Sequence, residues 1–212
     1  DDEILTNEDH EAGVIAYKNA LEIDPVHTTG YLSHLVESLQ NSTNRDADFY
    51  YYYGWANTQY GESNVAMQSY RKLLELEPNY LTDKAKTDPN NPEIYRDIAL
   101  LKFSEQDYKG ALEYFNKVIE LEPENLIGYS NRALARQRLE DYLGALEDYT
   151  KAIGMDSSHN LVPVLLRERG IVKKAIGNLE SAFEDWRQAS ELGDKDASKL
   201  LKDPDMRIYG LS

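Results

Sequence analysis

The sequence predicts an all-α fold, a solenoid of stacked antiparallel helix pairs. The first observation is an internal repeat, since residues 108–123 and 142–157 align without gaps at an offset of 34. The second is that each unit reads as two helical segments joined by a tight turn, Gln106-Asp107 or Glu140-Asp141. One helix hairpin cannot bury both of its faces, so neighbouring hairpins are expected to stack. A frame of small residues recurs with the repeat: Ala66, Ala111, Ala145 and Ala182 in second helices, and Gly54, Ala99, Ala133 and Gly170 in first helices.

The N-terminal part is the least regular. Residues 1–46 are expected to hold partial repeats, because Ala20 and Pro25 fit only a second helix and residues 28–46 only a first helix. A full repeat follows at 47–80, ended by Pro78, which lacks the N–H needed to continue a helix.

Residues 81–91 are predicted to be a linker or the remnant of a repeat. Pro78 and Pro123 are 45 residues apart, which exceeds the period by 11. Either half-repeats have degenerated, or segments of the natural chain are missing near 41–47 and 80–84. The second alternative is favoured, because a lone half-hairpin would expose an apolar face. The remaining elements are full repeats at 92–125, 126–159 and 163–193, and a capping helix with a tail at 194–212.

Composition excludes several classes of function. The chain of 212 residues has 38 acidic and 23 basic side chains, a formal net charge of −15. We expect no nucleic-acid binding, because phosphate contacts need clustered Lys and Arg. No apolar stretch approaches the roughly 20 residues of a membrane span. The chain begins at Asp1 without a leader pattern, so a signal or a longer N-terminal part is expected to have been removed. The compartment stays open: the cytoplasm is favoured, or the periplasm if a signal was removed.

Motifs for catalysis and for cofactors are missing from the sequence. It has no Cys, no HExxH zinc motif and no glycine-rich nucleotide loop. His34 and Glu37 form half of a metal motif, and Asn44, Asp46 and Asp48 imitate a calcium loop that lacks its glycine and its final Glu. We therefore expect a protein that is not an enzyme and binds neither a cofactor nor a metal.

The repeat resembles the tetratricopeptide repeat (TPR) family, in the prokaryotic variant with a "YNRGLAK"-like first helix. The resemblance covers residues 9 to 192 and implies a right-handed superhelix that binds protein partners. The matching residues are Tyr95, Ala99, Tyr108, Ala111, Phe115 and Pro123 in one unit and Tyr129, Ala133, Tyr142, Ala145 and Tyr149 in the next.

Two units share an arginine in the first helix and an aspartate in the second. These pairs are Arg132 with Asp148 and Arg169 with Asp185, and in the other units both positions change together, to Ile98 with Tyr114 and Tyr53 with Ser69. We expect partly buried ion pairs within each hairpin rather than a ligand site.

The resemblance also implies a concave peptide-binding face, lined by five positions of each first helix. Over four units these twenty positions carry a net charge of +2, and in the third unit they are Ile127, Ser130, Leu134, Gln137 and Arg138. Of the consecutive tyrosines 50–53, the frame places Tyr50 and Tyr53 in the core and Tyr51 at the groove. The carboxylate clamp for chaperone tails is not expected, since among its positions only Asn131 matches. The candidate groove residues are Tyr51, Trp55, Gln59, Arg96, Leu100, Phe103, Asn131, Arg138, Arg167 and Lys174.

The function expected from these observations is non-enzymatic protein–protein interaction. The protein would be a scaffold or adaptor that holds a peptide or a partner helix in its concave groove, with preference for an acidic or C-terminal ligand. The alternative is a structural protein that self-assembles through its repeat ends into dimers or arrays, so a homo-oligomer is possible.

Overall fold

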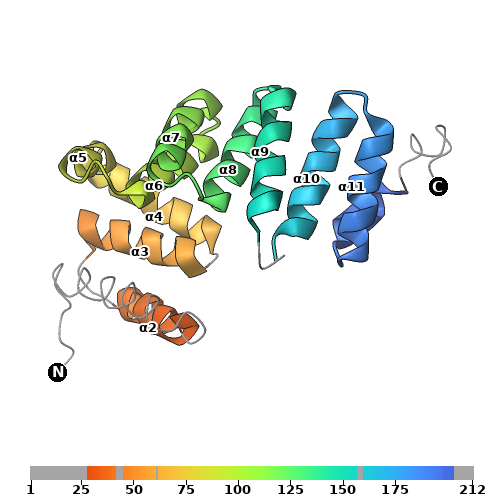
Figure 1. Ribbon diagram of the computed structural model, residues 1–212. Coiled ribbons are helices and arrows are strands. Elements are labelled where there is room, and N and C mark those ends of the chain that lie inside the picture. Colours follow the sequence, from red (N-terminus) through yellow and green to blue (C-terminus); the bar gives the residue numbers. More distant parts are fainter. Residues whose placement is uncertain (1–27, 42–44, 61, 157–159, 203–212) are drawn as a thin grey trace. The chain divides into compact units, whose positions relative to one another are not determined.

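The computed structural model describes residues 28–41, 45–60, 62–156 and 160–202, and all regular elements in these ranges are helices (Figure 1). The expected all-α fold is therefore confirmed. The partial repeat expected before residue 28 lies outside the described residues. The chain divides into two units, residues 1–89 and 90–212, and this boundary lies within the stretch 81–91 expected to be a linker or a repeat remnant.

The first unit contains one complete helix pair with an extra helix on either side along the chain. Helix α3 packs against α4, and α2 packs against α3. Tyr70 of α4 is fully buried, and a Cβ placed on Gly54 of α3 would lie 2.7 Å from its ring. The glycine is therefore what permits the close approach of the two helices. The helices are α2 (Thr28–Asn41), α3 (Ala47–Tyr60), α4 (Ser63–Leu76) and α5 (Tyr80–Thr87).

The second unit contains three helix pairs and a short terminal helix. The pairs are α6/α7, α8/α9 and α10/α11, and they stack in sequence order through contacts of α7 with α8 and of α9 with α10. This arrangement confirms the expected solenoid of helix pairs. The helices are α6 (Pro92–Ser104), α7 (Tyr108–Leu121), α8 (Leu126–Arg138), α9 (Tyr142–Met155), α10 (Val162–Ala175), α11 (Leu179–Glu191) and α12 (Lys195–Leu200).

The turn inside each of these pairs uses one residue with left-handed backbone. Gln106, Glu140 and Gly177 occupy the same place in the three turns, with φ of 64°, 62° and 82°. The residue after it caps the second helix of the pair. The side chains of Asp107, Asp141 and Asn178 each accept a hydrogen bond from the backbone N–H three residues later. The tight turns expected at 106–107 and 140–141 are confirmed.

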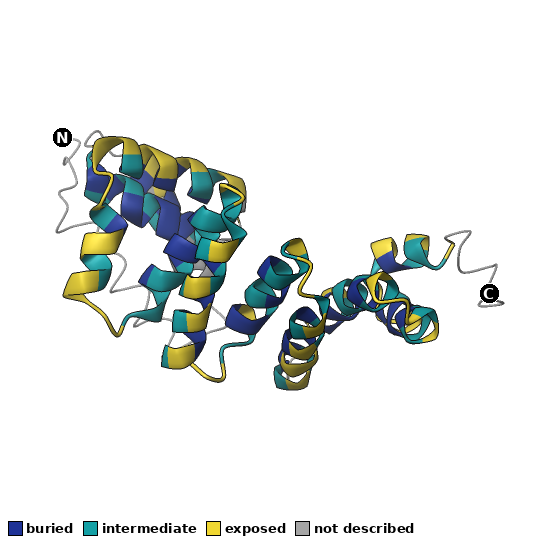
Figure 2. Cartoon of the chain, turned by 90° about the horizontal axis from the view of Figure 1, so that it is seen from above, coloured by how far each residue is buried: buried dark blue, intermediate teal, exposed yellow. Residues whose placement is uncertain are grey.

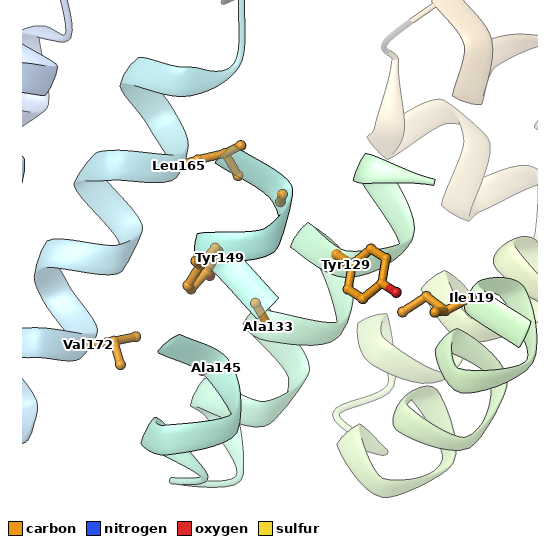
Figure 3. Packing of buried hydrophobic residues seen from close by; sticks show 8 residues of the cluster. Ile119, Tyr129, Ala133, Ala145, Tyr149, Leu165 and Val172 are labelled. Atoms are coloured by element: carbon orange, nitrogen blue, oxygen red, sulfur yellow. The ribbon is translucent and has the colours of Figure 1, made fainter. Parts of the chain in front are cut away.

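Small residues in first helices face large aromatic residues in second helices. In the middle of the second unit, Ala133 of α8 and Tyr149 of α9 belong to one buried cluster that also includes Leu165 of α10 (Figure 3). Residues where helices meet are buried, and most turns are exposed (Figure 2). Helix α12 covers the last pair, because Ala197 is buried in the cluster around Trp186.

The tyrosines 50–53 differ from the expectation. Tyr51 and Tyr52 are buried, at 5% and 7% exposure, whereas Tyr50 and Tyr53 are only half-buried. The expected assignment of Tyr50 and Tyr53 to the core and of Tyr51 to an open groove is thus wrong. The physical reason is α5, formed by the stretch expected to be a linker, since its Tyr80 ring lies 5.5 Å from the Tyr51 ring.

Candidate functional site

A cleft of about 450 Å³ lies in the second unit, between α8 and the start of α10, with Tyr149 of α9 in its lining. Its walls come from two consecutive first helices, which the stacking of helix pairs places next to each other. Tyr149 and Leu165, which line it, also belong to the buried cluster between the pairs (Figure 3). Because these two residues belong to the core, the packing that stabilises the fold also holds this part of the lining in place.

The wall of the cleft is mostly apolar. Ile127, Leu161 and Val164 are three of the seven large apolar side chains that are exposed in the described part of the chain. Leu134 and Leu165 extend this apolar surface. Exposed apolar side chains that gather in one hollow, rather than scatter singly, are typical of a binding site.

The polar groups of the cleft are few and come from α8 and α10. Ser130 and Asn131 occupy the middle of α8, and Arg138 is exposed at its end. Arg138 has no ion-pair partner among the described residues, which leaves its guanidinium available to a ligand. Glu168 of α10 is the second charge, and its Oε1 accepts hydrogen bonds from Arg167 at 2.9 and 3.2 Å. The two ionised side chains in the lining therefore sum to zero.

Tyr149 is the buried aromatic residue of the lining. Its hydroxyl donates to Oε1 of Gln137 at 3.2 Å. Burial raises the pKa of Tyr149 well above its usual value, the Glu168 carboxylate raises this pKa further, and Arg138 and Arg167 oppose the shift. The tyrosine therefore stays neutral.

The rim at Leu161 is fixed by a buried carboxylate. Oδ2 of Asp156 accepts the backbone N–H groups of Leu161 at 2.7 Å and Val162 at 3.0 Å. Asp156 is only 8% exposed, and its charge lies at the N-terminus of α10, where the helix dipole favours an anion. The loop residue Leu161 is thus held in position as part of the wall.

Two of the ten candidate groove residues, Asn131 and Arg138, lie in this cleft. Leu100 and Phe103 of α6 instead pack half-buried against the cluster around Phe115. The apolar candidates of α6 therefore do not line the cleft.

The other three candidate cations, Arg96, Arg167 and Lys174, do not line the cleft, and the two arginines contact carboxylates of this chain. Arg96 lies 3.4 Å from the buried Asp97, and Arg167 binds Glu168 and, at 2.8 Å, Asp194. Lys174 is half-buried in the last turn of α10, outside the cleft lining. The positive groove expected from the count of charges is reduced because adjacent carboxylates neutralise its arginines.

The candidates of the first unit are covered. Tyr51 and Trp55 are 5% and 2% exposed, so their rings serve as core rather than as open anchors. The side chain of Gln59 lies outside the described residues.

Val164 is one of the twenty frame positions, but sequence reasoning missed four other lining residues: Tyr149, Leu161, Leu165 and Glu168. Glu168 was detectable, since it holds the place in its helix that Asn131 holds 37 residues earlier. Leu161 lies before α10 in a connection between helix pairs, where the repeat frame assigns no role. No periodic signal identifies it.

The predicted ion pairs are confirmed as structural. Arg132 forms two bonds to Asp148, at 2.6 and 2.8 Å, and Arg169 two to Asp185, at 2.7 and 2.8 Å. A second cation joins each carboxylate, Arg136 at 2.8 Å and Lys173 at 2.7 Å. The Nη1 atoms of the two arginines also reach Asn116 and Thr150 on the preceding helix pair.

Within the described ranges, no group of three or more His, Cys, Asp or Glu side chains is placed to hold a metal ion. None of the helices described is long and apolar enough to cross a membrane.

Comparisons with known proteins concern the fold. The tetratricopeptide repeat family model matches residues 47–80 and 92–125. No curated protein matches the chain in sequence. A structure of MamA from AMB-1 is 19% identical with a TM-score of 0.55, and the match covers 86% of this chain and 96% of that one. MamA from MSR-1 is 17% identical with a TM-score of 0.54, over 88% and 98% of the two chains. The TPR domain of Arabidopsis OM64 is 25% identical over 50% of this chain and 88% of that domain, with a TM-score of 0.47. The likeness to MamA shows a shared fold.

Proposed function

We propose that this chain, which contains tetratricopeptide repeats, is a protein-interaction scaffold that binds a short extended peptide in the cleft between α8 and α10. The repeats themselves support a general role in protein interaction. The observation that carries the finer proposal is the cleft, where Ile127, Leu161 and Val164 are exposed together and Arg138 lacks an ion-pair partner in the described part of the chain.

The chemistry of the cleft indicates what such a peptide contains. An apolar side chain would bury itself at the Ile127 end, and a carboxylate would pair with Arg138, since guanidinium and carboxylate form two parallel hydrogen bonds. Eleven residues of helix separate Ile127 from Arg138, about 16 Å at 1.5 Å per residue. An extended peptide covers this distance in about five residues. The carboxylate comes from an acidic side chain or from a C-terminus.

The middle of the cleft restricts the ligand. Glu168 would repel a second acidic side chain at that level, whereas its second oxygen and the Asn131 amide are suited to peptide N–H and C=O groups. The proposed ligand is therefore not uniformly acidic: it has one carboxylate at the Arg138 end and an apolar residue at the other.

Selection from a displayed library of eight-residue peptides, with free and with blocked C-termini, tests the proposal. We expect enriched peptides to share an acidic group about five positions from an apolar residue. Their Kd should rise about tenfold or more in Arg138→Glu and in Val164→Asp, because each change places a charge against the ligand. Leu143→Asp is the matched control, since Leu143 is 68% exposed outside the cleft. Selected peptides that bind both cleft variants as tightly as the wild type would refute the proposal.

Self-assembly through the repeat ends is the less favoured candidate. Ala197 and Leu200 of helix α12, and Leu201 directly after it, pack against the cluster around Trp186, so the last helix pair already has a cover. Caps of this kind limit end-to-end stacking of repeat proteins.

A further inference from the structure

The face of α3 that carries Asp48 and Tyr51 is in contact with α5. These two residues lie 79 positions before Ile127 and Ser130, and the same offset relates Ala66 to Ala145. Ile127 and Ser130 line the open cleft of the second unit. The equivalent places in the first unit are therefore occupied by a segment of the chain itself.

The contacts of α5 with this face combine an aromatic residue and a lysine. Tyr80 donates its hydroxyl to Oδ1 of Asp48, and its ring lies 5.5 Å from that of Tyr51. One helical turn later, Nζ of Lys84 lies 4.6 Å from the Tyr51 ring centroid and 5.5 Å from that of Tyr52. Ammonium groups are attracted to ring faces at such distances, so the face is suited to a cation as well as to a phenol.

The opposite side of α5 faces solvent. Leu81 is buried, at 1% exposure, but Thr82, Asp83, Lys86 and Thr87 are exposed. A helix of eight residues is too short to be stable by itself in water, so α5 depends on docking through this one side. It docks through one side, with Leu81 buried and Tyr80 and Lys84 in contact with α3, and its other side is exposed.

We infer that Asp48, Tyr51 and Tyr52 form a second binding site, for a helical segment with an aromatic residue and a lysine four positions later, and that α5 occupies this site in cis. The site lies in the first unit and does not depend on the peptide proposed for the cleft. A partner segment of the same chemistry would bind by displacing α5.

The test uses the full chain and a fluorescent peptide with the sequence of residues 78–91. The opened variant Leu81→Ser/Lys84→Glu should release α5, and we expect it to bind the peptide at least tenfold more tightly than the wild type by anisotropy. Asp48→Ala added to the opened variant should remove most of this gain, because it removes the acceptor for the tyrosine hydroxyl. A peptide with its Tyr80 and Lys84 equivalents replaced by alanine is the control and should not bind.

Failure to bind by an opened variant that keeps its helical circular dichroism would overturn the inference, as would binding that is indifferent to Asp48→Ala. Hydrogen exchange on the wild type gives a readout that does not depend on the variants. Amides of α5 should exchange faster than those of α3 and α4. Exchange in α5 as slow as in α3 would show that α5 is an integral part of the unit and would refute occupation in cis.

Discussion

The first helices α3 and α8 present equivalent residues in opposite states. Ile127 and Ser130 of α8 line an open cleft, whereas Tyr51 of α3 is buried beneath α5 and Asp48 binds the Tyr80 hydroxyl. The helices that carry these residues are paired in the same way, α3 with α4 and α8 with α9. The difference arises from the segment after α4. It adds 11 residues to the repeat period between Pro78 and Pro123. Access to a face of this fold is therefore set by what lies between the repeats.

The interiors of the helix pairs differ as well. In α8/α9 and α10/α11 a buried aspartate binds two cations, but the equivalent positions in α3/α4 hold Tyr53 and Ser69. Ser69 satisfies its hydroxyl within its own helix, by donating to the carbonyl of Val65 at 2.8 Å. The last two helix pairs of the second unit thus depend on charge neutralisation at these positions, where α3/α4 does not.

The largest effect expected from this difference follows removal of a buried carboxylate. Asp148→Ala leaves Arg132 and Arg136 without their shared anion and should lower the free energy of unfolding by about 3–5 kcal/mol. Ser69→Ala, at the equivalent place in the first unit, should cost about 1 kcal/mol or less. Urea denaturation measures both. A double-mutant cycle of Arg132 and Asp148 without coupling would contradict the interpretation of the pair as an energetic unit.

A smaller effect tests a feature that both units share, a glycine of a first helix packed against an aromatic ring of the second helix. A Cβ on Gly170 would lie 2.4 Å from Nε1 of Trp186, and that indole cannot retreat freely because it donates to the carbonyl of Arg167 at 3.0 Å. Gly170→Ala should destabilise the protein by about 1–3 kcal/mol. Gly54→Ala should act in the same direction through Tyr70.

Gly154 provides the matched control for these two glycines. It lies in α9, and a Cβ added there would meet no described atom within 4 Å, so Gly154→Ala should stabilise the protein by about 0.5–1 kcal/mol through helix propensity. Thermal denaturation of the three variants compares them. Equal effects at Gly154 and Gly170 would mean that close helix approach is not what selects glycine.

A third effect is confined to the covered face of the first unit. Lys84→Ala removes the ammonium from the Tyr51 ring and should lower the free energy of unfolding by about 0.5–1 kcal/mol. Lys86→Ala should change it by less than about 0.5 kcal/mol, because Lys86 is exposed and its ion pair with Asp83 lies in solvent. If the two lysine variants lose the same stability in urea, the contact of Lys84 with the tyrosines is not an energetic one.

The repeat period predicts most of the fold but only part of the site. Small residues such as Ala133 and turn residues such as Glu140 have local signals, so the helix pairs were predictable. The cover on Tyr51 was not, because it depends on contacts with α5 residues about 30 positions away that break the period. The charge count of the groove was also a poor guide, since Arg167 is neutralised in part by Asp194 from another element. Frame positions predict which side chains share a face, and they do not predict what else reaches that face.

The most direct test of the covered face is the ionisation of Tyr80. Burial raises the pKa of its hydroxyl above the usual value, and the hydrogen bond to Asp48 raises it further. Because the folded state holds this proton more tightly than the unfolded state, its stabilising contribution is complete below about pH 10 and is lost as the pH rises above that value. Unfolding in urea at alkaline pH should therefore show a steeper loss of stability for the wild type than for Tyr80→Phe. Equal slopes would mean that Tyr80 ionises as an exposed tyrosine does, and then the face of α3 would be as accessible as the cleft beside α8.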